Sequence, residues 1–154
     1  MKTRGIAAGL ALALGFVCGC DDAIACNVDA CASSARLTGS VPVSTLPTLV
    51  DVSLCSQDVC QRALIELKPD PTQQSCTPGN LARVCLLPSD GRLFVTATWP
   101  YGEGEQTPRD GTSYQLQLTN HSTGASLVDV TRSVSHWRTS DDACHHCFYA
   151  EMSL

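Results

Sequence analysis

Aromatic and charged side chains are scarce in this sequence. Aromatic residues make up 5% and charged residues 16% of the 154 residues, whereas hydrophobic residues make up 44%. A chain that is disordered throughout has few hydrophobic residues and many charges, so this composition predicts a folded core. Basic residues are also few, 10 against 15 acidic ones, for a formal charge of −5. Nucleic acid is therefore not an expected partner, because its phosphates are bound through basic patches.

The sequence also lacks the short motifs that place catalytic or cofactor-binding groups. It has no Gly-x-Ser-x-Gly nucleophile elbow, no Asp-x-Asp-x-Asp-Gly calcium loop and no glycine-rich phosphate loop. Each of these motifs fixes a reactive side chain or a row of backbone N–H groups in the geometry that its chemistry needs. We therefore expect neither an enzyme nor a bound cofactor.

The sequence also lacks an apolar run long enough to cross a membrane. The longest apolar run lies near the N-terminus. Ile6 to Val17 is an uncharged apolar run of 12 residues that follows Lys2 and Arg4. A helix needs roughly 20 apolar residues to cross a bilayer, so this run is too short to span one. A positive start followed by a run of this length is typical of an export signal.

The run ends in Val17-Cys18-Gly19-Cys20, which resembles the lipobox of bacterial lipoproteins. The resemblance implies that residues 1–19 are removed as a signal peptide and that Cys20 becomes the acylated first residue. Two or more acyl chains anchor a protein stably, so the expected partner of Cys20 is the lipid bilayer. Ordinary secretion without lipidation is the alternative.

The resemblance to a lipobox implies that the protein lies in the bacterial cell envelope, with its domain in the periplasm or at the cell surface. Asp21-Asp22 resembles the inner-membrane retention signal of enterobacterial lipoproteins, but other groups do not all read that signal. The expected membrane is therefore either the inner or the outer one.

Ten cysteines are present, of which Cys18 and Cys20 belong to the lipobox. The other eight form four close pairs along an exported chain, where disulfides persist. The predicted bonds are Cys26–Cys31, Cys55–Cys60, Cys76–Cys85 and Cys144–Cys147. A connectivity that ties the N-terminal cysteines to the C-terminal pair is the alternative.

After residue 35, short apolar stretches with a period of two are separated by Gly, Pro, Asn and Asp. This pattern predicts β-strands joined by turns, and no stretch shows the stripe of an amphipathic helix. The residues expected to face inward are Val50, Val52 and Leu54; Ala63, Ile65 and Leu67; Leu93, Val95, Ala97 and Trp99; Tyr114, Leu116 and Leu118; Val128, Val130 and Val134; and Phe148, Ala150, Met152 and Leu154. Turns are expected at Pro88 to Gly91 and at Asn120 to Gly124.

Seven or eight such strands predict an all-β domain, a disulfide-stapled antiparallel β-sandwich. The hairpin from Tyr114 to Val134 resembles those of immunoglobulin-like or transthyretin-like extracellular modules, although the Cys…Trp…Cys spacing of antibody domains is missing. The expected organisation is a signal peptide at 1–19, a tether at 20–34 that begins with Cys20, and the sandwich at 35–154.

Cys144-His145-His146-Cys147 is the densest cluster of chemically active side chains. Cys-x-x-Cys resembles the motif of thiol oxidoreductases, but the alternation from Phe148 to Leu154 predicts a strand where that motif needs a helix. Two thiolates and two imidazoles also suit Zn²⁺ or copper, but four consecutive residues cannot all surround one ion. A stapled turn before the last strand is the simplest interpretation.

We therefore predict an envelope lipoprotein whose domain is a non-catalytic structural or protein-binding module, and another envelope protein is its expected partner. A periplasmic copper- or zinc-binding protein, or a thiol–disulfide redox protein, remains the alternative. Both alternatives would use Cys144, His145, His146 and Cys147.

Overall fold

The alternating apolar and polar residues form strands. The computed structural model describes residues 33–57, 59–68, 70–78, 82–100, 109–141 and 146–154, and these residues contain strands and no helix. The ten strands are β1 (Ser34–Pro42), β2 (Leu49–Ser56), β3 (Val59–Glu66), β4 (Ser75–Cys76), β5 (Arg83–Ser89), β6 (Arg92–Pro100), β7 (Ser113–Asn120), β8 (Ser126–Ser133), β9 (Arg138–Asp141) and β10 (His146–Ser153). The prediction of an all-β chain is confirmed for this part.

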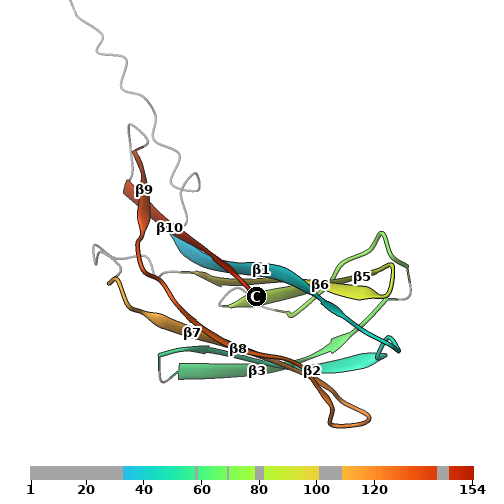
Figure 1. The fold of residues 1–154 in the computed structure, drawn as a ribbon. Helices are drawn as coiled ribbons and strands as arrows, with labels where there is room; N and C mark the ends of the chain where they lie inside the picture. Colours follow the sequence, from blue (N-terminus) through green and yellow to red (C-terminus); the bar gives the residue numbers. More distant parts are fainter. Residues whose placement is uncertain (1–32, 58, 69, 79–81, 101–108, 142–145) are drawn as a thin grey trace, which may run out of the picture.

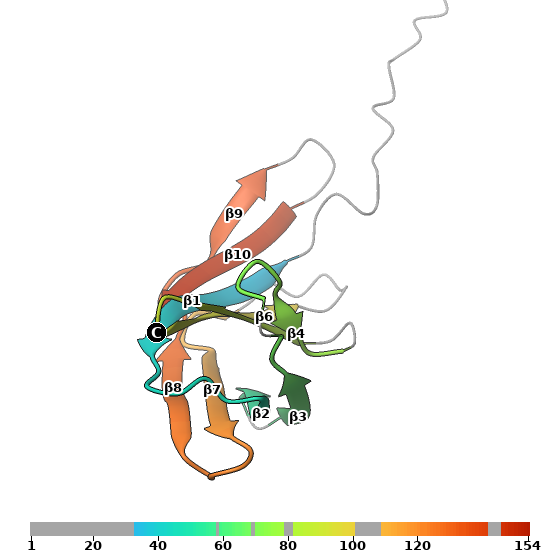
Figure 2. The same cartoon turned by 90° about the vertical axis from the view of Figure 1, so that its right-hand side faces the viewer.

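The strands form two sheets that lie one above the other (Figure 1). The six-stranded sheet has the order β4-β5-β6-β1-β10-β9, and the four-stranded sheet has the order β3-β2-β7-β8. Figure 2 shows β9 and the start of β10 extending away from the four-stranded sheet. The chain crosses between the sheets after β8, where Ser133 to Trp137 leads into β9.

Two details of the predicted sandwich were wrong. The pairing is not antiparallel throughout, because β10 runs parallel to β1, with Ala35 opposite Ala150. β6 occupies one edge of β1 as an antiparallel partner, and the crossover through β9 brings β10 to the other edge in the parallel direction. The described residues also form ten strands rather than seven or eight, because β4 and β9 are only two and four residues long.

The inner faces of the two sheets form one hydrophobic core. Among the residues predicted to face inward, Ala63, Val130, Phe148, Met152 and Leu154 are half-buried and the others are buried. Ala35 and Leu37 of β1 and Val84 and Leu86 of β5 complete the core. Because neither sheet can bury its apolar face alone, this packing holds the two layers together.

A two-residue turn joins β5 to β6 and fixes the register of this hairpin. Asp90 and Gly91 both have positive φ angles, 50° and 70°, which is the type I′ geometry that favours Asp-Gly. The predicted turn began too early, because Pro88 lies inside β5 opposite Leu93. The Pro88 nitrogen points away from β6, at a position of β5 that the short strand β4 does not reach. The missing N–H therefore removes no hydrogen bond from the sheet.

The predicted turn at Asn120 is confirmed, and the Asn120 side chain accepts hydrogen bonds from the backbone N–H groups of Ser122 and Thr123.

Two of the four predicted disulfides are confirmed. Cys55 and Cys60 lie opposite each other on β2 and β3, and their Cα atoms are 4.0 Å apart. Cys76 and Cys85 are opposite on β4 and β5 at a Cα distance of 4.1 Å. Each bond therefore joins neighbouring antiparallel strands on the edge of a sheet.

Replacing both Cys55 and Cys60 by Ser is expected to lower the free energy of unfolding by about 2 kcal/mol, because the unfolded chain regains the freedom of a short loop. Replacing Cys76 and Cys85, which close a slightly longer loop, is expected to cost about 3 kcal/mol. Urea denaturation of the oxidised protein measures both effects. The exposed Ser126→Ala change is the control and should alter stability by less than about 0.5 kcal/mol. Unchanged stability in both double variants would contradict the structural role of these bonds.

Candidate functional site

Five of the residues singled out from the sequence lie outside the described residues. These are Cys20, Cys26, Cys31, Cys144 and His145. The lipidation of Cys20 and the predicted bonds Cys26–Cys31 and Cys144–Cys147 therefore stay predictions. The structure instead shows polar side chains and an open strand edge in a part of the chain that contains no functional motif.

Cys147 lies within the described part and forms a disulfide. The other described cysteines bond to one another, so its partner is a cysteine outside the described residues. Only 9% of Cys147 is exposed, and a disulfide sulfur is not the thiolate that Zn²⁺ prefers. β10 begins at His146, so a strand follows the Cys-x-x-Cys sequence, as predicted, in place of the helix that activates thiols in oxidoreductases.

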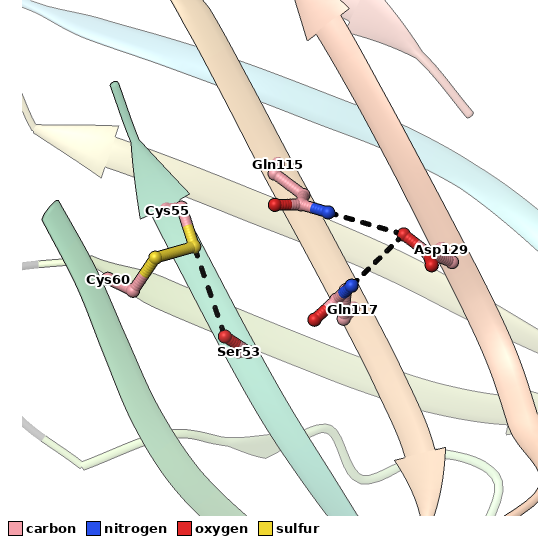
Figure 3. The surroundings of a disulfide bond; sticks show 6 residues. All are labelled: Ser53, Cys55, Cys60, Gln115, Gln117 and Asp129. Carbon is pink, nitrogen blue, oxygen red and sulfur yellow. Dashed lines mark hydrogen bonds between the residues drawn. A yellow bond between two sulfur atoms is a disulfide. The ribbon is translucent and has the colours of Figure 1, made fainter. Parts of the chain in front are cut away.

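The outer face of the four-stranded sheet is polar. Because its side chains alternate with those of the core, Ser53, Gln115, Gln117 and Asp129 lie together on this face beside the Cys55–Cys60 bond (Figure 3). Asp129 Oδ1 accepts hydrogen bonds from Nε2 of Gln115 at 3.4 Å and of Gln117 at 3.3 Å. Ser53 Oγ lies 4.0 Å from Cys55 Sγ. Hydrogen bonds thus connect polar side chains of β7 and β8 across this exposed surface.

An open depression of about 480 Å³ lies on this face across β3, β2 and β7. Asp51, Ser53, Arg62, Gln117 and Thr119 contribute its polar lining. At one side, Nδ1 of His121 is 2.9 Å from Oδ2 of Asp51, and both side chains are about half exposed. In the described part of the chain, Asp51 is the hydrogen-bond partner that the structure gives the His121 side chain.

The edge of β3 offers a different kind of site. The Cα distance of 4.0 Å between Cys55 and Cys60 identifies a non-hydrogen-bonded pair, in which backbone N–H and C=O groups point away from the partner strand. The Leu67 N–H donates to Thr48 O, which fits the same alternation. The backbone groups of Cys60, Arg62, Leu64 and Glu66 therefore point outward from β2.

Among the described strands, none pairs with this outer edge of β3. At the end of the strand, the Lys68 N–H donates to Ser75 Oγ at 2.9 Å, so the open stretch stops before β4. Val59 is 70% exposed and Leu64 is 48% exposed, so apolar side chains flank the open backbone groups. An edge of this kind is a template for pairing with another strand.

The opposite edge of the same sheet is connected to the other layer. The Arg132 guanidinium of β8 donates from Nε to Ser153 O of β10 at 2.9 Å. The chain then continues from β8 into β9 of the six-stranded sheet. Of the two edge strands, β3 is the one that carries large exposed apolar side chains, Val59 and Leu64.

Comparison with known protein families, with curated proteins and with solved structures finds no match to this chain. In the described residues, no helix is long and apolar enough to cross a membrane. The same residues contain no group of three or more His, Cys, Asp or Glu side chains that is arranged to hold a metal ion.

Proposed function

We propose that this protein is a bacterial envelope lipoprotein whose domain binds another envelope protein without catalysing a reaction. The observation that carries the proposal is the edge of β3, where outward backbone groups at Cys60, Arg62, Leu64 and Glu66 alternate over most of the strand. Such groups pair with an extended segment of a partner, which adds to the sheet as a further strand. In this proposal, the two-sheet domain is a β-sandwich similar to immunoglobulin-like or transthyretin-like extracellular modules.

The N-terminal sequence supports the proposed location of this domain in the cell envelope. Export through residues 1–19 and acylation of Cys20 would deliver the domain to a membrane surface. The 15 residues from Cys20 to Ser34 can span at most about 50 Å, which lets the domain stand clear of the lipid headgroups. The Cys55–Cys60 and Cys76–Cys85 disulfides are consistent with an oxidising compartment outside the cytoplasm.

The arrangement of polar groups favours binding over catalysis. The Asp51–His121 pair and the Gln115–Asp129 hydrogen bond lie on an exposed sheet face. Such groups are well placed to complement a polar partner surface, whereas catalysis needs a nucleophile and a base in a site that excludes water. The outer face can therefore contribute specificity beside the pairing edge.

Replacing Cys20 by Ser is expected to abolish lipidation, because the thiol accepts the diacylglyceryl group. The wild-type protein should partition with membranes, whereas the variant should be unlipidated, either as uncleaved precursor or as soluble protein. Mass spectrometry of the N-terminus of the wild-type protein measures the modification directly. An unmodified residue 20, or cleavage at another position, would show that the lipobox interpretation is wrong.

Replacing Leu64 by Pro tests the pairing edge. The Leu64 N–H points outward, so Pro removes a donor that the partner would use and leaves the bonds to β2 in place. Photo-crosslinking from position 62 in intact cells of the native host identifies the partner. The affinity of the purified pair is expected to fall at least about tenfold in the variant, the loss of one or two backbone hydrogen bonds.

Thr131→Pro is the matched control, because Thr131 occupies the equivalent outward position on the edge strand β8. Its affinity for the same partner is expected to stay within about twofold of the wild type. Equal losses in Leu64→Pro and Thr131→Pro, with both proteins folded by circular dichroism, would exclude β3 as the binding edge.

A further inference from the structure

The outward side chains of β3 form a short row whose chemical character changes along the strand. Side chains alternate along a strand, so Arg62, Leu64 and Glu66 lie on the same face, the outer face of the four-stranded sheet. All three side chains are exposed. The row therefore presents a positive, an apolar and a negative side chain, in that order, beside the open backbone groups of the edge.

The two charges of this row are available to a partner. In the part of the chain that the structure describes, neither Arg62 nor Glu66 forms an ion pair or a side-chain hydrogen bond. Asp51 on the neighbouring strand is engaged, because its Oδ2 lies 2.9 Å from Nδ1 of His121. Leu64 lies between the two charges and is 48% exposed. A strand that docks on this edge therefore meets two free charges with an apolar side chain between them.

The geometry of strand pairing decides which partner side chains these three residues meet. In an antiparallel pair, Arg62, Leu64 and Glu66 each exchange backbone hydrogen bonds with the residue directly opposite, because their N–H and C=O groups point outward. Directly opposite side chains lie on the same face, with Cβ atoms about 4.5–5.5 Å apart, so opposite charges attract and like charges repel. Antiparallel pairing is also slightly more stable per residue than parallel pairing. The row thus selects both the sequence and the register of the partner strand.

We propose, on the basis of strand pairing at β3, that the partner segment is an antiparallel strand with the pattern basic-x-apolar-x-acidic from its N-terminal to its C-terminal end. Its basic residue lies opposite Glu66, its apolar residue opposite Leu64 and its acidic residue opposite Arg62. This pattern names the kind of segment that the edge recognises.

The stretch from Arg62 to Glu66 has the same pattern, so the edge is also complementary to itself. However, two copies that each carry a formal charge of −5 repel one another, and a net charge far from zero favours the monomer. The proposed occupant is therefore a segment of a different protein.

Two capped peptides of identical composition test the pattern. The matching peptide is acetyl-Thr-Lys-Val-Leu-Val-Glu-Thr-amide, and in the exchanged peptide Lys and Glu trade places. NMR titration of the oxidised, ¹⁵N-labelled protein follows the backbone amide signals of Arg62 and Leu64. We expect the matching peptide to shift both signals saturably and to bind about tenfold more tightly than the exchanged peptide, because two cross-strand charge pairs contribute about threefold each.

A charge exchange in the protein provides the reciprocal test. The double variant Arg62→Glu with Glu66→Arg reverses the row and keeps Leu64 and the backbone, so it should prefer the exchanged peptide by about tenfold. The control is Arg83→Glu with Glu151→Arg, which exchanges two exposed charges on the six-stranded sheet. Its net charge is also unchanged, and it should keep the wild-type preference.

Several results would overturn the proposed pattern. These are the absence of a saturable shift with either peptide, equal affinities in the wild type, or a preference that the Arg62→Glu, Glu66→Arg variant does not invert. A concentration-dependent dimer in sedimentation experiments, lost in Leu64→Pro, would assign the edge to a second copy instead.

The partner itself separates this proposal from the proposed function. A cross-linked partner whose binding depends on Leu64 but whose docking segment lacks the pattern would overturn the pattern and leave pairing at β3 in place. Equal losses in Leu64→Pro and Thr131→Pro would instead remove β3 as the binding edge, and the pattern with it.

Discussion

The packing of two apolar sheet faces against each other is the interaction on which the rest of this structure depends. Leu93, Val95 and Trp99 of β6 and Leu116 and Leu118 of β7 come from different sheets and join one core. Because side chains alternate along a strand, this core also fixes which residues face outward. The polar depression and the position of the Cys55–Cys60 bond on the outer face follow from that alternation. The disulfides then hold the hairpins at the edges, where the core supplies little constraint.

The packing of two separate sheets also leaves strand edges unpaired and a small pocket between the sheets. The four-stranded sheet is open, so in the described residues its two outer strands, β3 and β8, each have a neighbouring strand on one side only. The β8 edge is tied to the other layer through Arg132 and the crossover into β9. A small pocket is lined by residues of both sheets, among them Trp99 of β6 and Tyr114 of β7. The open edges and this pocket both follow from how the strands are arranged.

Local features of the fold could be predicted from the sequence, whereas long-range features could not. The inward residues of β2, β6 and β7 follow from period-two alternation, and the two described disulfides join cysteines close in sequence. The parallel pairing of β10 with β1 depends on a crossover between sheets, and β4 is too short to show a pattern. The edge position of β3 depends on the order of strands. The exposure of Val59 and Leu64, which marks this edge, became visible only in the structure, because alternation in the sequence does not show which strand lies at the edge of a sheet.

Hydrogen exchange along β3 tests most directly whether its edge is open. In the isolated oxidised protein, the amides of Ala63 and Ile65 donate toward β2 and should be protected, whereas those of Arg62 and Leu64 point outward and should exchange quickly. Binding of the partner should then protect Arg62 and Leu64 while leaving Ala63 and Ile65 little changed. Uniform protection of all four amides in the isolated protein would contradict the account, because it would mean that the β3 edge is already covered and has no backbone groups to offer a partner.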